Sequence, residues 1–218
     1  RRCECHKRLI SKYIGINSNL TDAMRHQTFD SFDFSLFENQ PDVKGRPVIK
    51  LIKSAYNKSL EMANSFEVSH SNIFFYGSSG TGKTYLSSCI ANRVLQRGFT
   101  VCYQSAFKML DMLEKLKFGR YDEDERTNAE YEAKYFYDVD LLIIDDVGTE
   151  FITAYSSAAL FDIINSRLVE GKSTIISSNL TPVKIGDMYG GRMLSRIAGA
   201  YTAIPVEGVD LRLINKIK

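Results

Sequence analysis

The chain has 218 residues with a formal net charge of +2, and 44% of them are hydrophobic and 25% charged. This composition is typical of soluble globular proteins and excludes collagen-like, disordered and disulfide-rich classes. At roughly 150 residues per domain, the length predicts one domain with an appendage. A charge of +2 is too small to attract nucleic acid over the whole molecule, so any such contact requires a local patch. Because the first residue is Arg, we expect a fragment of a longer chain.

The apolar runs and the cysteines indicate a cytoplasmic protein without membrane contact. The longest strongly apolar run, at residues 141–144, is far short of the ~18 residues that span a bilayer. Four cysteines without a secretory leader indicate reduced thiols. Cys3 and Cys5 are too few ligands for a complete zinc site. Cys89 and Cys102 fall within an expected helix and an expected strand, which favours core positions.

Residues 1–70 differ in pattern from the rest of the chain. They lack a regular alternation of elements, and we expect an N-terminal extension, a linker and a lead-in helix. Apolar residues recur at helical spacing between Val48 and Met62, which predicts one amphipathic helix. The remaining residues, 71–218, are predicted to form the main domain.

Short apolar strands and helices alternate throughout the predicted main domain. Strands are expected at residues 73–76, 99–103, 140–145, 173–177 and 202–206. Helices are expected from a Gly-rich turn to residue 97, from about 105 to 116, from about 156 to 171, and at about 190–198. Such alternation predicts an α/β fold in which a parallel five-stranded sheet has helices on both faces.

The Gly-rich turn carries the most specific motif of the sequence. Residues 77–84, GSSGTGKT, match the P-loop pattern G-x-x-x-x-G-K-[ST] between a strand and a helix. Glycines allow backbone N–H groups to close on phosphates, and the helix N-terminus adds positive potential. Lys83 is expected to reach the β- and γ-phosphates, and Thr84 to ligate magnesium. The residues expected to contact ATP are Gly77, Ser78, Ser79, Gly80, Thr81, Gly82, Lys83, Thr84 and Tyr85.

Polar residues end two of the predicted strands on the same edge of the sheet. Asp145 and Asp146 follow the third strand, and in a parallel sheet that end lies beside the phosphate loop. Asp145 is expected to hold magnesium through water, and Asp146 to orient or activate the attacking water. Asn179 follows the fourth strand and can bond the water or the γ-phosphate. Alone, such an Asn is more often a turn former.

Several segments together resemble a known family from about Thr28 to Lys218. The chain is similar to the AAA+ domain of bacterial replicative helicase loaders of the DnaC/DnaI type, which are related to IstB-type ATPases. The matching segments are TFDSF at residue 28, the phosphate loop, LLIIDDVG at 141, STIISSNL at 173, GRMLSRI at 191 and GVDLR at 208. The resemblance implies a P-loop NTPase of the AAA+ type.

The resemblance also implies roles for polar residues near the end of the chain. It makes Asn179 the sensor-1 residue and Arg212 the sensor-2 arginine, which contacts the γ-phosphate in cis. Arg196 is implied to be an arginine finger that completes the ATP site of a neighbouring subunit, so self-association is expected. Asp146 stands where many AAA+ proteins carry Glu, which affects the rate of catalysis rather than magnesium binding. The chain ends shortly after Arg212, so no C-terminal lid domain is expected.

A basic segment precedes an acidic one between the second and third predicted strands. Initiators and loaders of this type carry a helical insert there that contacts single-stranded DNA. Lys115, Lys117, Phe118 and Arg120 combine an aromatic ring with cations, as single-strand binding requires. The alternative is a solvated helix end, because residues 122–125 are all acidic.

The leading hypothesis is a magnesium-dependent ATPase that delivers the hexameric replicative helicase to single-stranded DNA. An IstB-type transposition-accessory ATPase shares every motif and differs only in its partner. A nucleotide kinase would need an acceptor pocket and a basic lid, and no segment is a candidate for either. A nucleotide-gated DNA-binding scaffold that scarcely hydrolyses ATP is the non-enzymatic alternative.

Overall fold

The computed structural model describes residues 18–38, 40–41, 45–66 and 71–214. Within these residues, parallel strands form a five-stranded sheet in the order β2-β3-β4-β1-β5. The strands are β1 (Ile73–Tyr76), β2 (Val101–Ser105), β3 (Leu141–Val147), β4 (Ser173–Ser178) and β5 (Thr202–Pro205). The predicted α/β fold with a parallel five-stranded sheet is therefore confirmed.

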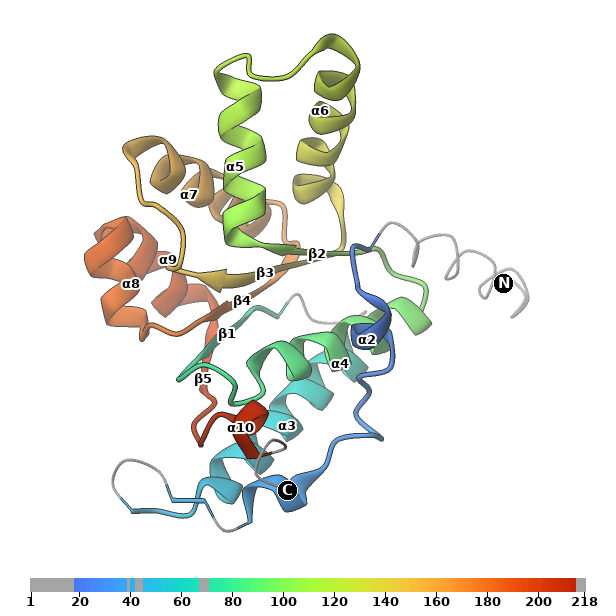
Figure 1. The fold of residues 1–218 in the computed structure, drawn as a ribbon, viewed down its shortest axis with the longest axis vertical. Helices are drawn as coiled ribbons and strands as arrows, with labels where there is room; N and C mark the ends of the chain where they lie inside the picture. Colours follow the sequence, from blue (N-terminus) through green and yellow to red (C-terminus); the bar gives the residue numbers. More distant parts are fainter. Residues whose placement is uncertain (1–17, 39, 42–44, 67–70, 215–218) are drawn as a thin grey trace.

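Helices cover both faces of the sheet (Figure 1). One face carries α2 (Asp22–Arg25), the 3₁₀ helix η1 (Phe34–Phe37), α3 (Val48–Ser65) and α4 (Lys83–Gln96). The other carries α5 (Ala106–Lys117), α6 (Glu123–Asp138), α7 (Ala154–Val169), α8 (Pro182–Tyr189) and α9 (Gly191–Ala200). Helices α5 and α6 form an arm that projects from the sheet (Figure 1). After β5 the described chain holds only the short α10 (Leu211–Ile214), so this part contains no lid domain.

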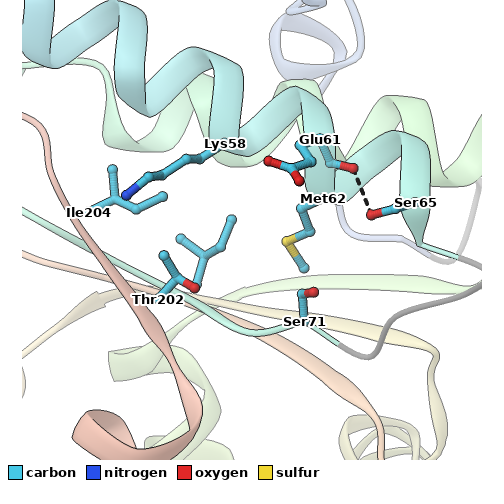
Figure 2. Close-up of a pocket in the computed structure, with 8 residues that line it drawn as sticks. Lys58, Glu61, Met62, Ser65, Ser71, Thr202 and Ile204 are labelled. Atoms are coloured by element: carbon cyan, nitrogen blue, oxygen red, sulfur yellow. Dashed lines mark hydrogen bonds between the residues drawn. The ribbon is translucent and has the colours of Figure 1, made fainter.

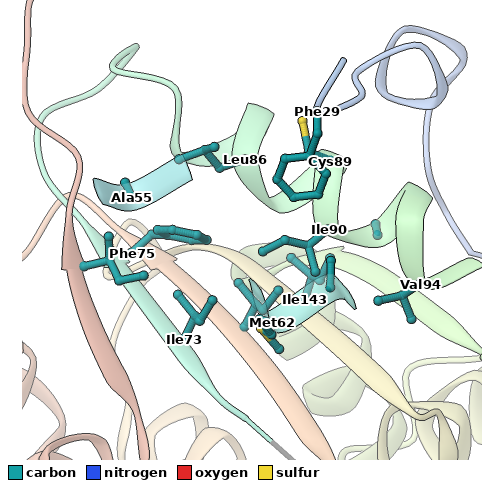
Figure 3. Packing of buried hydrophobic residues seen from close by; sticks show 14 of the residues in the cluster. Phe29, Ala55, Met62, Ile73, Phe75, Leu86, Cys89, Ile90, Val94 and Ile143 are labelled. Carbon is teal, nitrogen blue, oxygen red and sulfur yellow. The ribbon is translucent and has the colours of Figure 1, made fainter. Parts of the chain in front are cut away.

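Alternate residues of each central strand contribute to two separate cores. Ile73 and Phe75 of β1 pack against α3 and α4, whereas Phe74 packs toward the face of α5 to α9. Successive strand side chains point to opposite faces, and both faces here are buried, which explains the nearly continuous apolar runs of the sequence. Figure 3 shows the first core, in which Phe29 from the N-terminal segment lies near Cys89 of α4.

A buried arginine on α7 fixes the base of the α5–α6 arm. Arg167 is 0% exposed. It donates to the carbonyls of Phe136 and Val139 at the end of α6, at 2.9 and 3.0 Å. It also donates to Ser173 O at 2.6 Å and to Thr174 Oγ1 at 3.0 Å on β4. Burial lowers the pKa of Arg167 to about 10, so it remains charged at neutral pH and joins α6, α7 and β4.

The elements differ from the sequence-based predictions in several places. The second strand begins at Val101 and not at residue 99, because the N–H and hydroxyl of Thr100 donate to Asp140 Oδ2. The third strand continues past its two acids to Val147. No bounds were predicted for helices α6 and α8, although Asp122 and Thr181 cap them and a proline stands in the first turn of α8.

The cysteine predictions can be compared with the structure only in part. Cys89 and Cys102 are buried free thiols, as predicted, whereas Cys3 and Cys5 lie outside the described residues. Within the described ranges, no group of three or more His, Cys, Asp or Glu side chains is arranged to hold a metal. None of the described helices is long and apolar enough to span a bilayer.

Candidate functional site

The glycines of the phosphate loop adopt conformations that other residues rarely reach. Gly77, Gly80 and Gly82 have φ values of 146°, 72° and 105°. A Cβ atom on Gly80 would lie 1.9 Å from Asp210 Oδ1, and one on Gly77 would lie 2.1 Å from Val206 O. The loop therefore needs glycine at these positions, and it packs directly against the segment that follows β5.

The amine of Lys83 is surrounded by oxygen acceptors at the centre of the loop. It donates to Gly77 O and Ser78 O at 2.7 Å each, and to Asn179 Oδ1 at 2.8 Å. Lys83 is only 5% exposed. Burial lowers its pKa, and the nearby carboxylates of Asp146 and Asp145 oppose that shift. A buried ammonium at the N-terminus of a helix, inside a glycine loop, fits a phosphate group.

Asp145 accepts hydrogen bonds from three different elements. Thr84 Oγ1, at the start of α4, lies 3.1 Å from Asp145 Oδ2. The hydroxyls of Tyr103 on β2 and Ser177 on β4 also donate to this carboxylate. Burial and the nearby Asp145 raise the pKa of Tyr103, so the phenol remains protonated and donates to the carboxylate. A carboxylate beside a hydroxyl is a donor set that suits Mg²⁺.

Asp146 lies in a β-bulge immediately after Asp145. The register between β3 and β4 shifts between Ile144 and Val147, and Asp146 has a φ of 58°. Its N–H donates to Ser177 Oγ at 3.1 Å. Burial raises the pKa of Asp146, as does the charge of Asp145, while Lys83 and Arg212 lower it. The bulge thus takes Asp146 out of the regular strand, and the charges of Lys83 and Arg212 act on its carboxylate.

Arg212 reaches the phosphate loop from the C-terminal segment. It donates to both carboxylate oxygens of Asp210, at 2.9 and 2.8 Å, and to Ser79 Oγ at 2.7 Å. The N–H of Leu211 donates to Gly80 O at 3.0 Å. Asp210 therefore holds the sensor-2 candidate in contact with the loop of its own chain.

Arg196 lies on another surface, on α9 above α7. Its Nε donates to Asn165 Oδ1 of α7 at 2.8 Å. A cavity of about 380 Å³ beside it is lined by Phe161, Asn165, Arg192, Ser195 and Arg196. Among the hydrogen bonds and ion pairs of the described residues, Arg196 has none with its own phosphate loop. This position is compatible with action on a neighbouring subunit, which stays a prediction.

Tyr85 faces the N-terminal segment. Its hydroxyl donates to Ser31 O at 3.0 Å, and its ring packs edge-on against Phe32 at 5.5 Å. Gln40, which the sequence analysis did not single out, accepts from the N–H of Val209 at 2.8 Å. The structure therefore brings the segments before α3 and after β5 together beside the loop.

The candidate DNA-binding residues lie at the outer end of α5. Phe118 is 56% exposed, and Arg120 lies over its ring at 5.8 Å. Lys115 pairs with Asp111 at 2.8 Å, and Arg120, just beyond α5, lies 3.9 Å from Glu114 of that helix. Two of the cations are thus partly compensated by acids, and Lys117 is exposed.

The structure contains a separate pocket at the opposite edge of the sheet (Figure 2). It has a volume of about 300 Å³ and lies between α3 and the first residues of β1 and β5. Lys58, Glu61 and Met62 line it from α3, and Ser71 and Thr202 from the sheet side. None of the P-loop residues lines this pocket.

Sequence reasoning missed Tyr103, Ser177 and Asp210. The parallel register that pairs Ser105 with Asp145 brings Tyr103 within reach of that acid, and Ser177 stands opposite the bulge. Polar residues at the ends of neighbouring strands are the signal that could have indicated the first two. Asp210 is marked only by its spacing of two residues from Arg212.

Comparisons of the sequence show which known proteins this chain resembles. DnaA, the chromosomal replication initiator protein of Aquifex aeolicus (strain VF5), is 32% identical over 167 residues, 75% of this chain and 38% of that protein. The replicative helicase loader DnaC of Buchnera aphidicola subsp. Baizongia pistaciae (strain Bp) is 27% identical over 139 residues, 64% of this chain and 55% of that protein. The chain thus spans less than half the length of the DnaA protein and about half that of the DnaC protein.

Solved structures give the same fold. The crystal structure of a DnaC helicase loader superposes with a TM-score of 0.68 at 18% identity, over 85% of this chain and 99% of that one. A DnaA bound to AMPPCP and single-stranded DNA superposes with a TM-score of 0.66 at 26% identity, over 87% of this chain and 51% of that one. The resemblance to DnaC/DnaI-type proteins is therefore confirmed. The model of the IstB-like ATP-binding protein family matches residues 5–218, and the chain belongs to that family.

Proposed function

We propose that this chain is a magnesium-dependent ATPase that delivers the hexameric replicative helicase to single-stranded DNA. The observation that carries the ATPase part is the convergence of Lys83, Thr84, Asp145, Asp146 and Asn179 at one edge of the sheet. Hydrogen bonds join Lys83 to Asn179 and Thr84 to Asp145. Such a set combines a cation for phosphate, ligands for a metal and a carboxylate for the attacking water.

Each residue has a distinct task in this proposal. Backbone N–H groups of residues 77–84 and the amine of Lys83 would hold the phosphates, while Thr84 and Asp145 would hold magnesium. Bound magnesium would neutralise charge on the phosphate oxygens. Asp146 would orient the attacking water, and Asn179 would fix that water or the γ-phosphate. Tyr85 would contact the nucleotide together with the N-terminal segment that its ring and hydroxyl hold.

The arginines would make hydrolysis depend on nucleotide state and on assembly. Arg212, held by Asp210 against Ser79, would contact the γ-phosphate of its own chain. Arg196 would enter the site of a neighbouring copy, so that a single subunit hydrolyses slowly. Lys115, Lys117, Phe118 and Arg120 on the arm would contact single-stranded DNA. The DnaA relative bound to single-stranded DNA supports DNA binding by analogy.

The partner distinguishes this proposal from the transposition-accessory alternative. The name of the matching family favours an IstB-type role, and the DnaC relative favours a loader. The deciding experiment mixes the full-length protein, ATP, circular single-stranded DNA and the replicative helicase of the same cell, and measures helicase bound to the circle. A loader raises that amount in an ATP-dependent way. A transposition-accessory protein leaves it unchanged and instead stimulates a transposase encoded beside it.

Replacing the central lysine tests the ATPase part. Lys83→Ala removes charge-assisted hydrogen bonds worth about 1.5–3 kcal/mol, so affinity for a fluorescent ATP analogue should fall by roughly 10–100-fold. The fold should persist, because the amine contacts loop carbonyls and no apolar core. Lys134→Ala, on the exposed side of α6, is the control. Equal affinities for the two variants, both folded by circular dichroism, would remove the basis for the phosphate-loop assignment.

A further inference from the structure

We propose that Tyr103 and Ser177 are positioning residues that set how tightly Asp145 holds magnesium, and that Ser177 also joins Asp145 to Asp146. The inference rests on the proposed ATPase function and deepens it, because it assigns metal affinity and turnover to different hydroxyl groups. Neither residue belongs to the P-loop or to the sensor residues.

Both strands that flank β3 contribute a hydroxyl to the same carboxylate. The Tyr103 hydroxyl on β2 donates to Asp145 Oδ2, and the Ser177 hydroxyl on β4 donates to Oδ1. Thr84 Oγ1 adds a third contact from α4. Asp145 is 6% exposed and Ser177 is 0% exposed. The carboxylate is therefore fixed from three sides by groups that are themselves held in secondary structure.

Neutral hydrogen-bond donors affect the charge of the Asp145 carboxylate differently from a cationic partner. A lysine or arginine bound to Asp145 would neutralise the charge that a metal requires. Hydroxyl donors satisfy the buried carboxylate without cancelling its charge. Hydrogen bonds to a ligating carboxylate orient it, and their loss typically costs 10–100-fold in metal affinity. Tyr103 and Ser177 occupy this supporting position around Asp145.

Ser177 has a second contact that Tyr103 lacks. Its oxygen accepts from the N–H of Asp146 at 3.1 Å, inside the bulge where two residues of β3 oppose one of β4. Asp146 has a positive φ of 58°, which costs free energy for a residue other than glycine. Removing the Ser177 hydroxyl thus removes a hydrogen bond that stabilises this backbone conformation of Asp146. Loss of Tyr103's hydroxyl should change metal affinity alone, whereas loss of Ser177's should change metal affinity and turnover.

The experiment separates these two effects. Binding of a fluorescent ATP analogue is titrated against Mg²⁺, and kcat is measured at saturating Mg²⁺. For Tyr103→Phe, which keeps the packed ring, the half-saturating Mg²⁺ concentration should rise about 10-fold or more, with kcat within about twofold of wild type. For Ser177→Ala, the half-saturating Mg²⁺ concentration should rise similarly, and kcat should also fall about 10-fold or more. Ser177→Thr, which retains the hydroxyl, should lie nearer to wild type in both measurements.

Matched controls separate positioning from general loss of a buried hydroxyl. Tyr137→Phe removes a phenol that donates to another carboxylate, Asp162 Oδ2, at 2.8 Å. Ser59→Ala removes a buried hydroxyl that donates to Ala55 O at 2.7 Å within α3. Both controls should leave the Mg²⁺ titration unchanged. Thermal unfolding of all variants without nucleotide shows whether each is folded.

Two results would overturn the inference. One is an unchanged Mg²⁺ titration for Tyr103→Phe, whatever its melting temperature. The other is Ser177→Ala and Ser177→Thr behaving alike. Failure of the proposed function looks different, because ATP binding would then be insensitive to Lys83→Ala. If Lys83→Ala weakens ATP binding and Tyr103→Phe leaves the Mg²⁺ titration unchanged, this inference is rejected and the proposed function is not.

Discussion

Arg196→Ala should bind ATP with wild-type affinity and hydrolyse it about 10³–10⁵-fold more slowly in the assembled state. This is the loss observed when an arginine finger is removed from phosphoryl transfer. The expectation follows from the position of Arg196 on α9, where its Nε is bound to Asn165. Because Nε is engaged, the terminal nitrogens are the part of the guanidinium oriented for another partner. Steady-state hydrolysis and equilibrium ATP binding, measured in parallel, check the result.

Mixing two inactive variants tests whether the arginine acts in trans. Arg196→Ala mixed with Asp146→Asn should recover activity, because an interface with an intact Asp146 and an intact Arg196 can form from one chain of each. Asn is the suitable substitution, since it tolerates a left-handed backbone as Asp does. Arg192→Ala, one turn earlier on α9, is the control. No recovery under conditions where mixed oligomers form, or a large loss in Arg192→Ala instead, would reject the assignment of Arg196.

The second large effect concerns stability. Arg167→Ala should lower the free energy of unfolding by at least about 3 kcal/mol, because it leaves several buried carbonyls at the end of α6 and on β4 without a donor. For a chain of this size, that corresponds to a melting temperature lower by about 6–12 °C. Arg167→Lys should recover only part of the loss, since one ammonium cannot replace a planar guanidinium with several donors. Urea unfolding and calorimetry provide the measurement.

An exposed arginine provides the matched comparison. Arg126 pairs with Glu130 on the surface of α6 at 2.9 Å, and exposed pairs contribute at most about 1 kcal/mol. Arg126→Ala should therefore change stability little. ATP affinity of folded Arg167→Ala should equal that of wild type, because Arg167 contacts no residue of the phosphate loop. Equal stability of Arg167→Ala and Arg126→Ala would show that the buried contacts contribute nothing.

The sequence predicted those features that depend on neighbouring residues. The phosphate loop is continuous in the chain, and its glycines, Lys83 and Thr84 are recognisable by spacing alone. The strands followed from short apolar runs, because the central strands β1, β3 and β4 are largely buried on both faces. The sheet edge that gathers Asp145, Asp146 and Asn179 followed from parallel pairing.

Features that depend on distant contacts could not be predicted in this way. Tyr103 and Asp145 are 42 positions apart, and apolar periodicity does not show which tyrosine will bond a given acid. Arg167 looked like any polar residue near a helix end, although it is fully buried. The bulge at Asp146 was not predicted, because the expected third strand ended at Asp145. Its position depends on the register against β4, which a single strand does not contain.

The left-handed backbone at Asp146 has a consequence for engineering the proposed ATPase. Many AAA+ proteins carry Glu at this position, and replacing Asp146 with Glu would be the obvious way to improve the proposed water activation. Asp and Asn are enriched at positive φ, whereas most other side chains cost about 1–2 kcal/mol there. Glu at position 146 would therefore favour a shift of the bulge, and that shift would move the carboxylate away from the place that Asp146 gives it. A useful design changes the bulge first, by restoring regular pairing between β3 and β4, and lengthens the acid afterwards.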